Sequence, residues 1–360
     1  MINFSIPCDF NETTLSALSK LNAQYNHARV SEVYGQVTQG EFIASGRMLS
    51  LLPKVTIKDL ETYMIFCNKY GIKFNYTLNA SCMNNLEFDK TANVQLIRFI
   101  RILIEIGVSS FTVTLPRLIE LILEHFPEIE IKASAICEIT SPDKAKHYKE
   151  KGVKRIVVDP DITRRFRILK NIVDTFGDGV EIIINNMCTK NCPYKMFHYN
   201  HEAHSGAQSN DIESQYYFHM CTMQKVKNQN GYIRMNWIRP EDLIYYEQIG
   251  IRHFKLQGRN NPNGTKIVNT LRHYFDRQFN GNLLELITLF SPYNAFQPYI
   301  DNSKLDGFIQ RFYQNDSFCS NLCETCGYCL EYAKKSIDIC QLDELNKKAS
   351  RLIKSMLCDR

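Results

Sequence analysis

The chain has 360 residues, of which 44% are hydrophobic, and its formal net charge is +5 at pH 7. This length fits one barrel-sized domain with a small appendage, and the apolar fraction excludes wholesale disorder. The slight positive charge argues against a dedicated DNA-binding protein. We find neither a signal peptide nor the roughly 20 consecutive apolar residues of a membrane span, so we predict a cytoplasmic protein without a membrane partner.

Short β-like segments alternate with amphipathic helices from the N-terminus onward, and several helices end at a glycine that directly precedes a strand. Eight strands are predicted, at 4–6, 30–34, 72–78, 110–115, 129–136, 153–158, 180–184 and 252–256. Helices are predicted at 12–22, 58–70, 94–106, 118–125, 142–151, 162–176 and 239–249. This repeat favours an α/β protein with a TIM-like (β/α)8 barrel. The alternative is an open doubly wound sheet, but no Gly-rich phosphate fingerprint follows the first strand.

We predict that the barrel domain covers residues 1–289 and carries an insert rich in cysteine and histidine at 186–238. Within this insert, His198, His201 and His204 are predicted to lie on a polar loop. Two further helices, at 266–274 and 281–289, complete this domain. The rest of the chain, 290–360, is predicted to be a small cysteine-rich C-terminal extension. Its last segment, 342–357, has the charged amphipathic pattern of a surface helix.

The thirteen cysteines are not expected to form a disulfide framework, because the cytoplasm keeps thiols reduced. Five are scattered along the chain: Cys8, Cys67, Cys82, Cys137 and Cys358. The other eight form two groups: Cys188, Cys192 and Cys221 upstream, and Cys319, Cys323, Cys326, Cys329 and Cys340 in the tail. Thiolates at short spacing are typical ligands of iron–sulfur clusters and of zinc.

The upstream thiols follow the predicted strand 180–184, where a barrel places its functional groups. Three cysteines are one ligand short of a complete set. The fourth ligand is expected to be a tail cysteine, a substrate atom, or one of the nearby histidines His198, His201, His204 and His219. The alternative is that these cysteines are incidental residues of a loop.

The tail segment CSNLCETCGYC has the spacing of ferredoxin-like runs and zinc knuckles. Three upstream and five tail cysteines make two sets of four, which suggests that Cys319 or Cys340 crosses over to the upstream site. We therefore predict two [4Fe–4S] clusters, with zinc as the alternative at the tail. Spacing alone does not decide between iron and zinc.

Charged and polar residues at predicted strand ends are candidates for the active site. We predict catalytic roles for Arg165, His198, Lys255 and Arg259, with the arginines and the lysine binding anionic groups and the histidine closing a polar lid. Surface charge, a salt-bridged arginine and a solvated loop are the structural alternatives. Further candidate pocket residues at strand ends are Asn79, Glu138, Asp159, Arg164 and Asn185.

Several of these segments together resemble the peptidase U32 family of collagenase-like proteins. They are Asn186-Met-Cys188, Cys221, the segment WIRPEDL from Trp237 and the segment FKLQGR ending at Arg259. The resemblance covers roughly 94–289, and the tail CETCGYCLEYAKK resembles the C-terminal extension of a shorter subgroup.

The resemblance implies a TIM-like barrel that holds a [4Fe–4S] cluster at its mouth. Cys188 and Cys221 match the family's cluster cysteines, whereas Cys192 lies in the same loop at a less general spacing. The helix from Pro240 lacks the cysteine that some relatives carry, so the fourth ligand stays open. Family members with better-defined roles look like oxygen-independent hydroxylation proteins acting on ubiquinone precursors, tRNA or rRNA, some with prephenate as the oxygen donor.

The leading hypothesis is therefore an iron–sulfur-dependent modifying enzyme that hydroxylates, or otherwise oxidises or reduces, a small molecule, a peptide or an RNA base. An electron-donor protein would be its partner. One alternative is a non-catalytic iron–sulfur protein that transfers electrons or acts as a scaffold. The other is a U32-type peptidase, although the sequence has neither a Gly-x-Ser-x-Gly nor a His-Glu-x-x-His motif.

Overall fold

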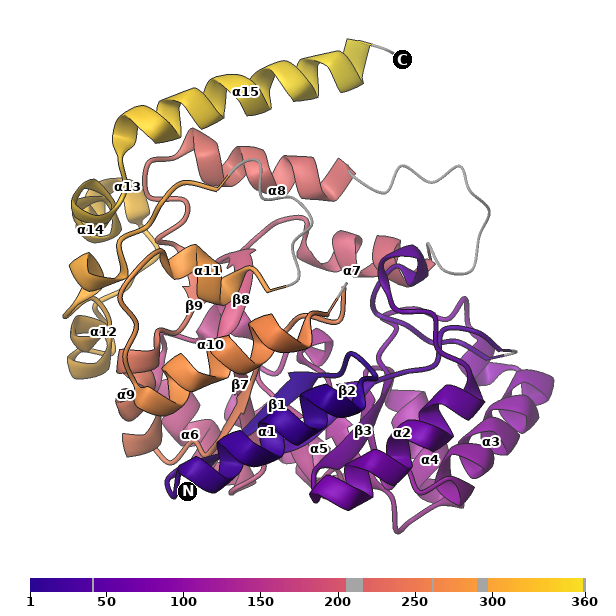
Figure 1. Cartoon of the computed structure of the whole chain (residues 1–360). Helices are drawn as coiled ribbons and strands as arrows, with labels where there is room; N and C mark the ends of the chain where they lie inside the picture. The colour runs from indigo at the N-terminus through magenta and orange to yellow at the C-terminus, as the bar shows by residue number, and fades with distance from the viewer. Residues whose placement is uncertain (41, 205–215, 261, 290–296, 359–360) are drawn as a thin grey trace.

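A closed barrel of eight parallel strands forms the centre of the molecule (Figure 1). The computed structural model describes residues 1–40, 42–204, 216–260, 262–289 and 297–358, apart from the side chains of 324, 353 and 355–358. Around the barrel the strands follow the order β1 (Ile2–Pro7), β10 (His253–Lys255), β7 (Val180–Ile183), β6 (Arg155–Val157), β5 (Glu130–Ala133), β4 (Ser110–Val113), β3 (Lys73–Leu78) and β2 (Ala28–Gly35). Pairing of β1 with β10 closes the ring, which confirms the predicted TIM-like fold.

Helices surround the barrel and follow the predicted positions closely. They are α1 (Glu12–Gln24), α2 (Ile57–Tyr70), α3 (Lys90–Glu105), α4 (Pro116–His125), α5 (Pro142–Glu150), α6 (Phe166–Phe176), α9 (Leu243–Gln248) and α10 (Gly264–Asp276). Local signals explain their ends. A capping box between Thr56 and Asp59 begins α2, and Gly71, with φ +65°, ends it in the left-handed region that favours glycine.

The strands place apolar residues on the outside of the barrel and polar residues inside it. Phe74, Phe111, Ile131, Ile182 and Phe254 are buried and alternate along their strands with polar residues. The polar residues hydrogen-bond to one another inside the barrel: Ser5 with Glu32, Asn75 with Ser110 and Thr112, and Lys132 with Glu32 and Glu181. Most TIM barrels instead fill this space with bulky branched side chains.

A buried ion network lies at the centre of this polar interior. The Nζ atom of Lys132, 0% exposed, lies 2.5 Å from Oε1 of Glu32 and 2.9 Å from Oε2 of Glu181. Arg155 pairs with Glu32 and, at 2.5 Å, with Glu130. Burial alone would raise the pKa of Glu32, but Lys132, Arg155 and Lys255 hold that pKa well below its ordinary value. The network therefore keeps both central carboxylates ionised without solvent.

The described part of the insert is more ordered than the predicted loop. It contains an antiparallel pair, β8 (Asn185–Thr189) and β9 (Met235–Trp237), and two helices, α7 (Lys195–His204) and α8 (Tyr216–Lys227). The prediction that His198, His201 and His204 lie on a loop is wrong, because all three lie on α7. The last residues of the predicted polar loop, from Ser205 onward, lie outside the described residues until α8 begins.

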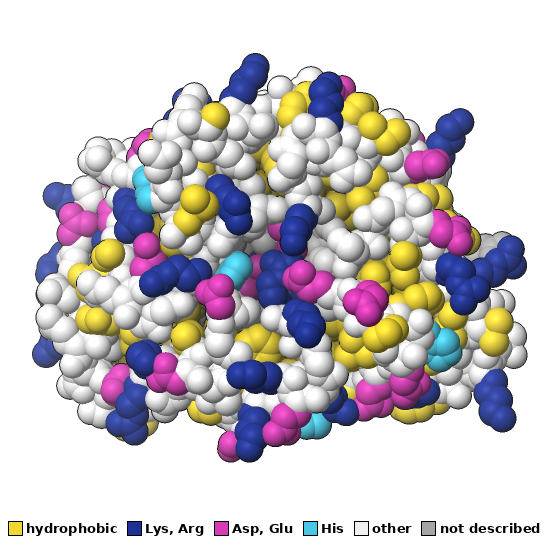
Figure 2. All heavy atoms as spheres, turned by 90° about the horizontal axis from the view of Figure 1, so that it is seen from below, with side chains coloured by type: hydrophobic (Ala, Val, Ile, Leu, Met, Phe, Trp, Pro, Cys, Tyr) yellow, Lys and Arg dark blue, Asp and Glu magenta, His cyan; other side chains and the backbone are white. Residues whose placement is uncertain are grey.

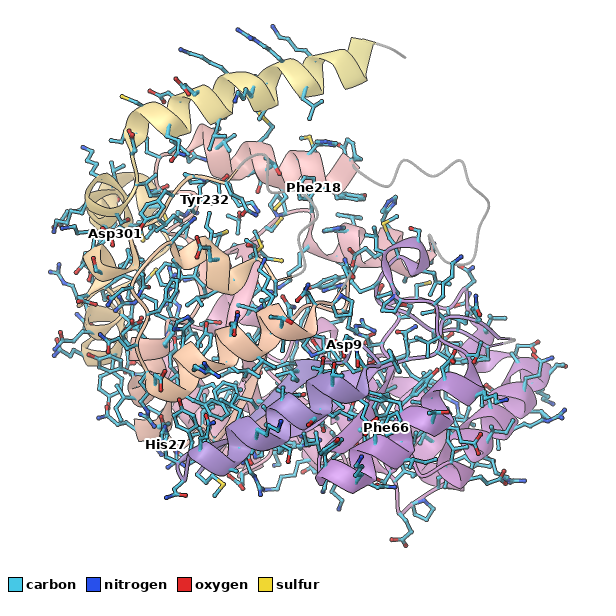
Figure 3. The ribbon with its side chains drawn as sticks, viewed as in Figure 1. Asp9, His27, Phe66, Phe218, Tyr232 and Asp301 are labelled. Atoms are coloured by element: carbon cyan, nitrogen blue, oxygen red, sulfur yellow. The ribbon has the colours of Figure 1, made fainter. Side chains whose placement is uncertain are left out.

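The C-terminal extension packs along one side of the barrel and over its mouth (Figure 1). Helix α11 (Leu283–Ile287) precedes the extension. The helices of the extension are α12 (Gln310–Gln314), α13 (Cys323–Cys326), α14 (Tyr328–Ser336) and α15 (Ile339–Cys358), the last of which lies along α8. Figure 3 shows the two ends of the molecule: the buried Tyr232 lies below α8, near the mouth of the barrel, and His27 lies at the opposite end of the barrel.

Arg239 of the WIRPEDL segment fastens the extension to the barrel. It pairs with both oxygens of Asp242, at 2.9 and 3.0 Å, and its Nη1 donates to the carbonyl of Asn302 and to Asp306, each at 2.9 Å. Only 2% of its side chain is exposed. Arginine suits this position because its planar guanidinium can donate in several directions at once. The WIRPEDL segment therefore has a structural role, which is to attach the extension to the barrel, rather than a role in a reaction.

The face of the molecule below the barrel carries mixed charge. Figure 2 shows Lys and Arg side chains interspersed with Asp and Glu on this face, with no large area of one sign.

Within the described residues, no helix combines the length and the apolar character that a membrane span requires.

Candidate functional site

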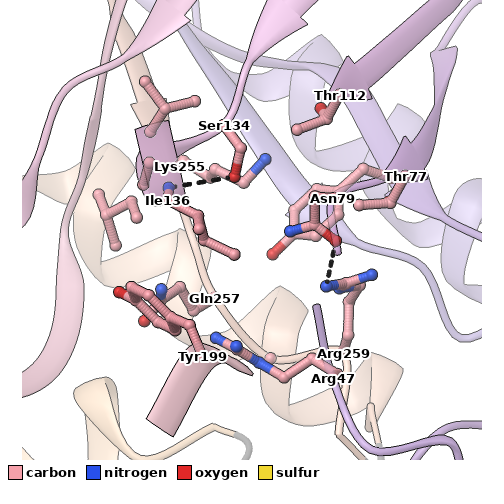
Figure 4. Close-up of a pocket in the computed structure, with 15 residues that line it drawn as sticks. Arg47, Thr77, Asn79, Thr112, Ser134, Ile136, Tyr199, Lys255, Gln257 and Arg259 are labelled. Carbon is pink, nitrogen blue, oxygen red and sulfur yellow. Dashed lines mark hydrogen bonds between the residues drawn. The ribbon is translucent and has the colours of Figure 1, made fainter. Parts of the chain in front are cut away.

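A cavity of about 540 Å³, open solvent included, lies at the carboxyl ends of the barrel strands (Figure 4). Side chains from seven of the eight strands or their following loops, and one from α7, form its wall. The lining residues are Tyr34, Arg47, Thr77, Asn79, Thr112, Ser134, Ala135, Ile136, Val157, Ile183, Tyr199, Lys255, Gln257, Gly258 and Arg259. This is the position in which TIM-barrel enzymes hold their substrates.

Arg259 is a buried cation whose partners in the cavity wall are neutral amides. Its Nη1 donates to Oε1 of Gln36 at 2.6 Å, and its Nη2 donates to Oδ1 of Asn79 at 3.0 Å. Among the described residues it makes no ion pair. Burial, and then repulsion from Arg47, lower the pKa of Arg259 to about 10, so it remains charged at neutral pH. A buried charge without a counterion is expected to attract an anionic ligand.

Arg47 connects the cavity to α7. Its Nη1 lies 2.6 Å from Oε2 of Glu202, and Oε1 of Glu202 lies 3.5 Å from Nε2 of His198. Burial of the Glu202 carboxyl is outweighed by Arg47 and His198, which lower its pKa to about 2. The pair therefore holds α7 against the rim, and Tyr199 of the same helix lines the cavity.

Lys255 rises from the last strand into the cavity between an aromatic ring and a carboxylate. Its Nζ lies 3.8 Å from the ring centroid of Tyr34 and 3.7 Å from Oε1 of Glu181. Burial, and then repulsion from Lys132, lower the pKa of Lys255 to about 7 against the partial support of Glu181. Its amine therefore changes charge near neutral pH, which suits a group that binds an anion or transfers a proton.

The cavity wall offers cations, hydroxyls and amides. Thr77, Thr112 and Ser134 contribute hydroxyl groups beside the three cationic side chains. Among the described residues, the lining contains no cysteine, histidine, aspartate or glutamate. This chemistry matches a small anionic molecule with further oxygen atoms to hydrogen-bond.

Cys188 lies near enough to Cys192 and Cys221 to be influenced by them electrostatically, and it lies near Arg47 and Tyr199 of the cavity wall. Cys188 is on β8, Cys192 follows that strand, and Cys221 is on α8. Burial raises the pKa of Cys188 to about 12, with neighbouring Cys221 and Cys192 adding to the rise and Lys225 and Arg47 opposing it. Arg47 is thus shared between the thiols and the cavity wall.

The donor chemistry of this thiol group fits an iron–sulfur cluster. Three soft sulfur ligands with a lysine and an arginine beside them can accommodate the negative charge of thiolates. In the described part of the chain, no three His, Cys, Asp or Glu side chains surround a point that one metal ion could occupy. The side chains as placed therefore do not form a single-ion site.

The predicted site residues divide between the cavity and its surroundings. Lys255, Arg259 and Asn79 line the cavity, whereas Arg165 and His198 do not. Arg165 lies near Lys190 and Cys319 instead.

Other predicted residues have structural partners. Glu138 and Asp159 both pair with Lys195, at 3.5 and 2.7 Å, and so anchor the start of α7. The amide of Asn185 bonds to the backbone of Gln257. Arg164 donates to the carbonyls of Ile233 and Met235.

Sequence reasoning missed Arg47, Tyr34 and Tyr199 as cavity residues. Tyr34 ends a predicted strand, and this strand-end position was the one available signal. Arg47 lies in the long connection between β2 and α2, where no periodic pattern points to a wall of the cavity. Tyr199 reaches the cavity because α7 folds over the barrel mouth, which is a tertiary property.

Comparisons with known proteins agree with this architecture. The family model described as "Peptidase family U32" matches residues 22–320. A protein of Methanocaldococcus jannaschii described as an uncharacterized protease is 30% identical over 344 residues, which are 94% of this chain and 99% of that protein. A solved structure described as that of a U32 peptidase has a TM-score of 0.52 and 15% identity, over 72% of this chain and 93% of the other. The last similarity concerns the fold alone.

Proposed function

The chain belongs to peptidase family U32, and from this premise we propose that it is an iron–sulfur-dependent modifying enzyme acting on a small carboxylate-bearing substrate. The observation that carries the proposal is the cavity lined by Arg47, Lys255 and Arg259, with Cys188 near Arg47 and with Cys192 and Cys221 near Cys188. The proposed reaction is an oxygen-independent hydroxylation or related redox chemistry.

Cys188, Cys192 and Cys221 would hold the cluster. When bound by only three protein thiolates, such a cluster would supply a redox-active iron with one coordination position free of protein ligands. Lys225 and Arg47 lie near Cys188 and would offset the charge of the thiolates.

The side chains of the cavity would bind and orient the substrate. Arg259 is fixed by Gln36 and Asn79 and would bind a carboxylate through the N–H groups that these amides leave free. Lys255 would bind a second oxygen or hold a proton at its Nζ. The hydroxyls of Thr77, Thr112 and Ser134 would orient the remaining oxygens, and Tyr199 on α7 would limit access of water.

A second candidate function is peptide hydrolysis, as the family name suggests. Ser134 and Lys255 both line the cavity (Figure 4), and a lysine with a pKa of about 7 could act as the general base of a serine–lysine pair. We favour the first function because three cations line the cavity, which suits an anionic molecule better than an extended peptide.

The proposal is tested on protein purified anaerobically. Iron and sulfide are quantified in the native chain and in Cys188→Ser, and a panel of aliphatic and aromatic carboxylic acids is titrated by calorimetry. We expect loss of about four irons per chain in the variant and binding of at least one acid class. Absence of iron from the native protein, or binding of tRNA without binding of any acid, would overturn the proposal.

Peptidase assays separate the second candidate from the first. Labelled casein and gelatin are incubated with the native chain, Ser134→Ala and Cys188→Ser. Hydrolysis that disappears in Ser134→Ala but persists in Cys188→Ser would establish the serine–lysine mechanism instead. We expect no hydrolysis by any of the three proteins.

The affinity for the carboxylate ligand is expected to fall about tenfold as the pH rises from 6 to 8, because Lys255 loses its positive charge through a pKa of about 7. Calorimetric titrations across this range provide the measurement. In Lys255→Gln the affinity should be low and independent of pH. The exposed Lys73→Gln is the matched control and should retain the native profile. A native affinity that does not change between pH 6 and 8 would show that Lys255 does not bind the anion.

A further inference from the structure

Four tail cysteines line a second cavity, separate from the barrel mouth. Cys319, Cys323, Cys326 and Cys329 share a space of about 330 Å³, open solvent included. The rings of Phe312, Phe318 and Tyr328 form the rest of its wall, together with Ser320, Asn321 and Leu322. These four are among the twelve cysteines of the described residues that form no disulfide.

The four thiols form one group because they line the same cavity. No residue of the upstream group contributes to the wall of this cavity.

Three cations lie around the tail thiols. The Nζ of Lys190 donates to Sγ of Cys319 at 3.5 Å, and Arg165 also lies near this sulfur. Arg164 is buried against the rings of Trp237 and Phe308, at 4.7 and 4.8 Å, and faces Cys329. Cations beside sulfur ligands stabilise thiolates and the metal centre that they hold. This arrangement gives Arg165 and Arg164 a role away from the substrate cavity.

We propose that Cys319, Cys323, Cys326 and Cys329 hold a second four-iron cluster that is complete without any upstream residue. The proposal goes beyond the proposed function, which requires only the upstream thiols. It assigns Cys319 to the tail site, so this residue does not complete the upstream set. Cys340 is exposed at the start of α15 and does not line the tail cavity.

A four-iron cluster takes four thiolate ligands, which is the number of cysteines that line this cavity. It also needs more space between its sulfur ligands than a single zinc ion, whose ligands lie about 2.3 Å from the metal. Quantification of iron and zinc separates the two.

Lys190 connects the tail site to the upstream site. It lies between Cys188 and Cys192 in sequence, and its ammonium group hydrogen-bonds to Cys319. A positive charge and an N–H donor at a ligand sulfur favour the reduced form of a cluster, which carries more negative charge. Lys190, in the loop that carries the upstream cysteines, therefore influences the reduction potential of the tail cluster. It acts as a positioning residue for that cluster.

Metal content tests the proposal on the full chain purified anaerobically. The native protein should contain about eight irons, and both Cys326→Ser/Cys329→Ser and Cys188→Ser should retain about four. Cys340→Ser is the matched control and should retain all of them. Iron that is unchanged in the tail double variant, or one zinc per chain that this variant loses, would overturn the tail cluster.

The two proposals fail in different ways. If only Cys188→Ser loses iron, the tail proposal fails and the proposed function stands. If only the tail double variant loses iron, the proposed function fails and the tail cluster stands.

The role of Lys190 is tested by redox titration followed by electron paramagnetic resonance. In Lys190→Met the tail cluster should have a more negative reduction potential at unchanged iron content, and Lys190→Arg should restore most of the native value. The exposed Lys304→Met is the control and should leave the potential unchanged. A native potential in Lys190→Met would refute the assigned role.

Discussion

Lys132→Met is expected to lower the free energy of unfolding by about 3–5 kcal/mol, because it leaves buried carboxylates without their cation. Lys132 is 0% exposed and is within ion-pair distance of both Glu32 and Glu181. Removing one member of such a network costs far more than removing a surface charge, since water cannot replace the lost partner. Urea-induced unfolding under anaerobic conditions, followed by circular dichroism, provides the measurement.

Two further variants control this experiment. Lys146→Met removes an exposed lysine paired with Glu150 at 3.8 Å and should change the stability by no more than about 0.5 kcal/mol. Lys132→Met/Glu181→Gln removes one carboxylate together with the lysine and should recover part of the loss. If Lys132→Met alone unfolds at the same urea concentration as the native chain, the network contributes nothing to stability.

Arg259→Gln is expected to weaken binding of the carboxylate ligand by roughly 30- to 5000-fold, which corresponds to the loss of about 2–5 kcal/mol for one member of a buried charge pair. Arg259 has neutral partners in Gln36 and Asn79, so its charge remains available to the ligand. Calorimetric titration with the acid that binds the native chain provides the measurement.

Two arginine variants show whether the effect is specific to this guanidinium. Arg259→Lys keeps the charge but loses the planar pair of donors, so its loss of affinity should be smaller than that of Arg259→Gln. Arg117→Gln removes a partly exposed arginine that pairs with Glu124 outside the cavity and should bind the acid as the native chain does. Equal affinities of Arg259→Gln and the native chain would exclude Arg259 from the binding site.

The barrel could be predicted because each strand and helix carries a local signal. Helix-ending glycines such as Gly71, and strands such as Lys73–Leu78, repeat along the chain at regular intervals. The same signals could not predict β8 and β9, because these strands are short and pair across the long insert. Their pairing depends on contacts distant in sequence, as the pairing of Asn185 on β8 with Trp237 on β9 illustrates.

The substrate cavity was predicted only in part. Lys255 lies at the end of a strand and Arg259 follows it, so both could be placed at the mouth of a barrel from sequence alone. Arg47 could not, because its position depends on Glu202 of α7, which is 155 residues away in the chain. His198 and Arg165 have the residue types of an active site, but their contacts are with Glu202 and with the surroundings of Cys319.

The charged centre of the barrel has a consequence for how the domain can be divided. Its ion pairs join β5 to β2 and β7, and β6 to β2, so Glu32, Lys132, Arg155 and Glu181 from these four strands form one electroneutral unit. A half-barrel cut after β4 would retain Glu32 but neither Lys132 nor Arg155, and its interior would contain an anion with no counterion. Gene duplication or fragment complementation at this boundary would therefore not join two self-sufficient pieces.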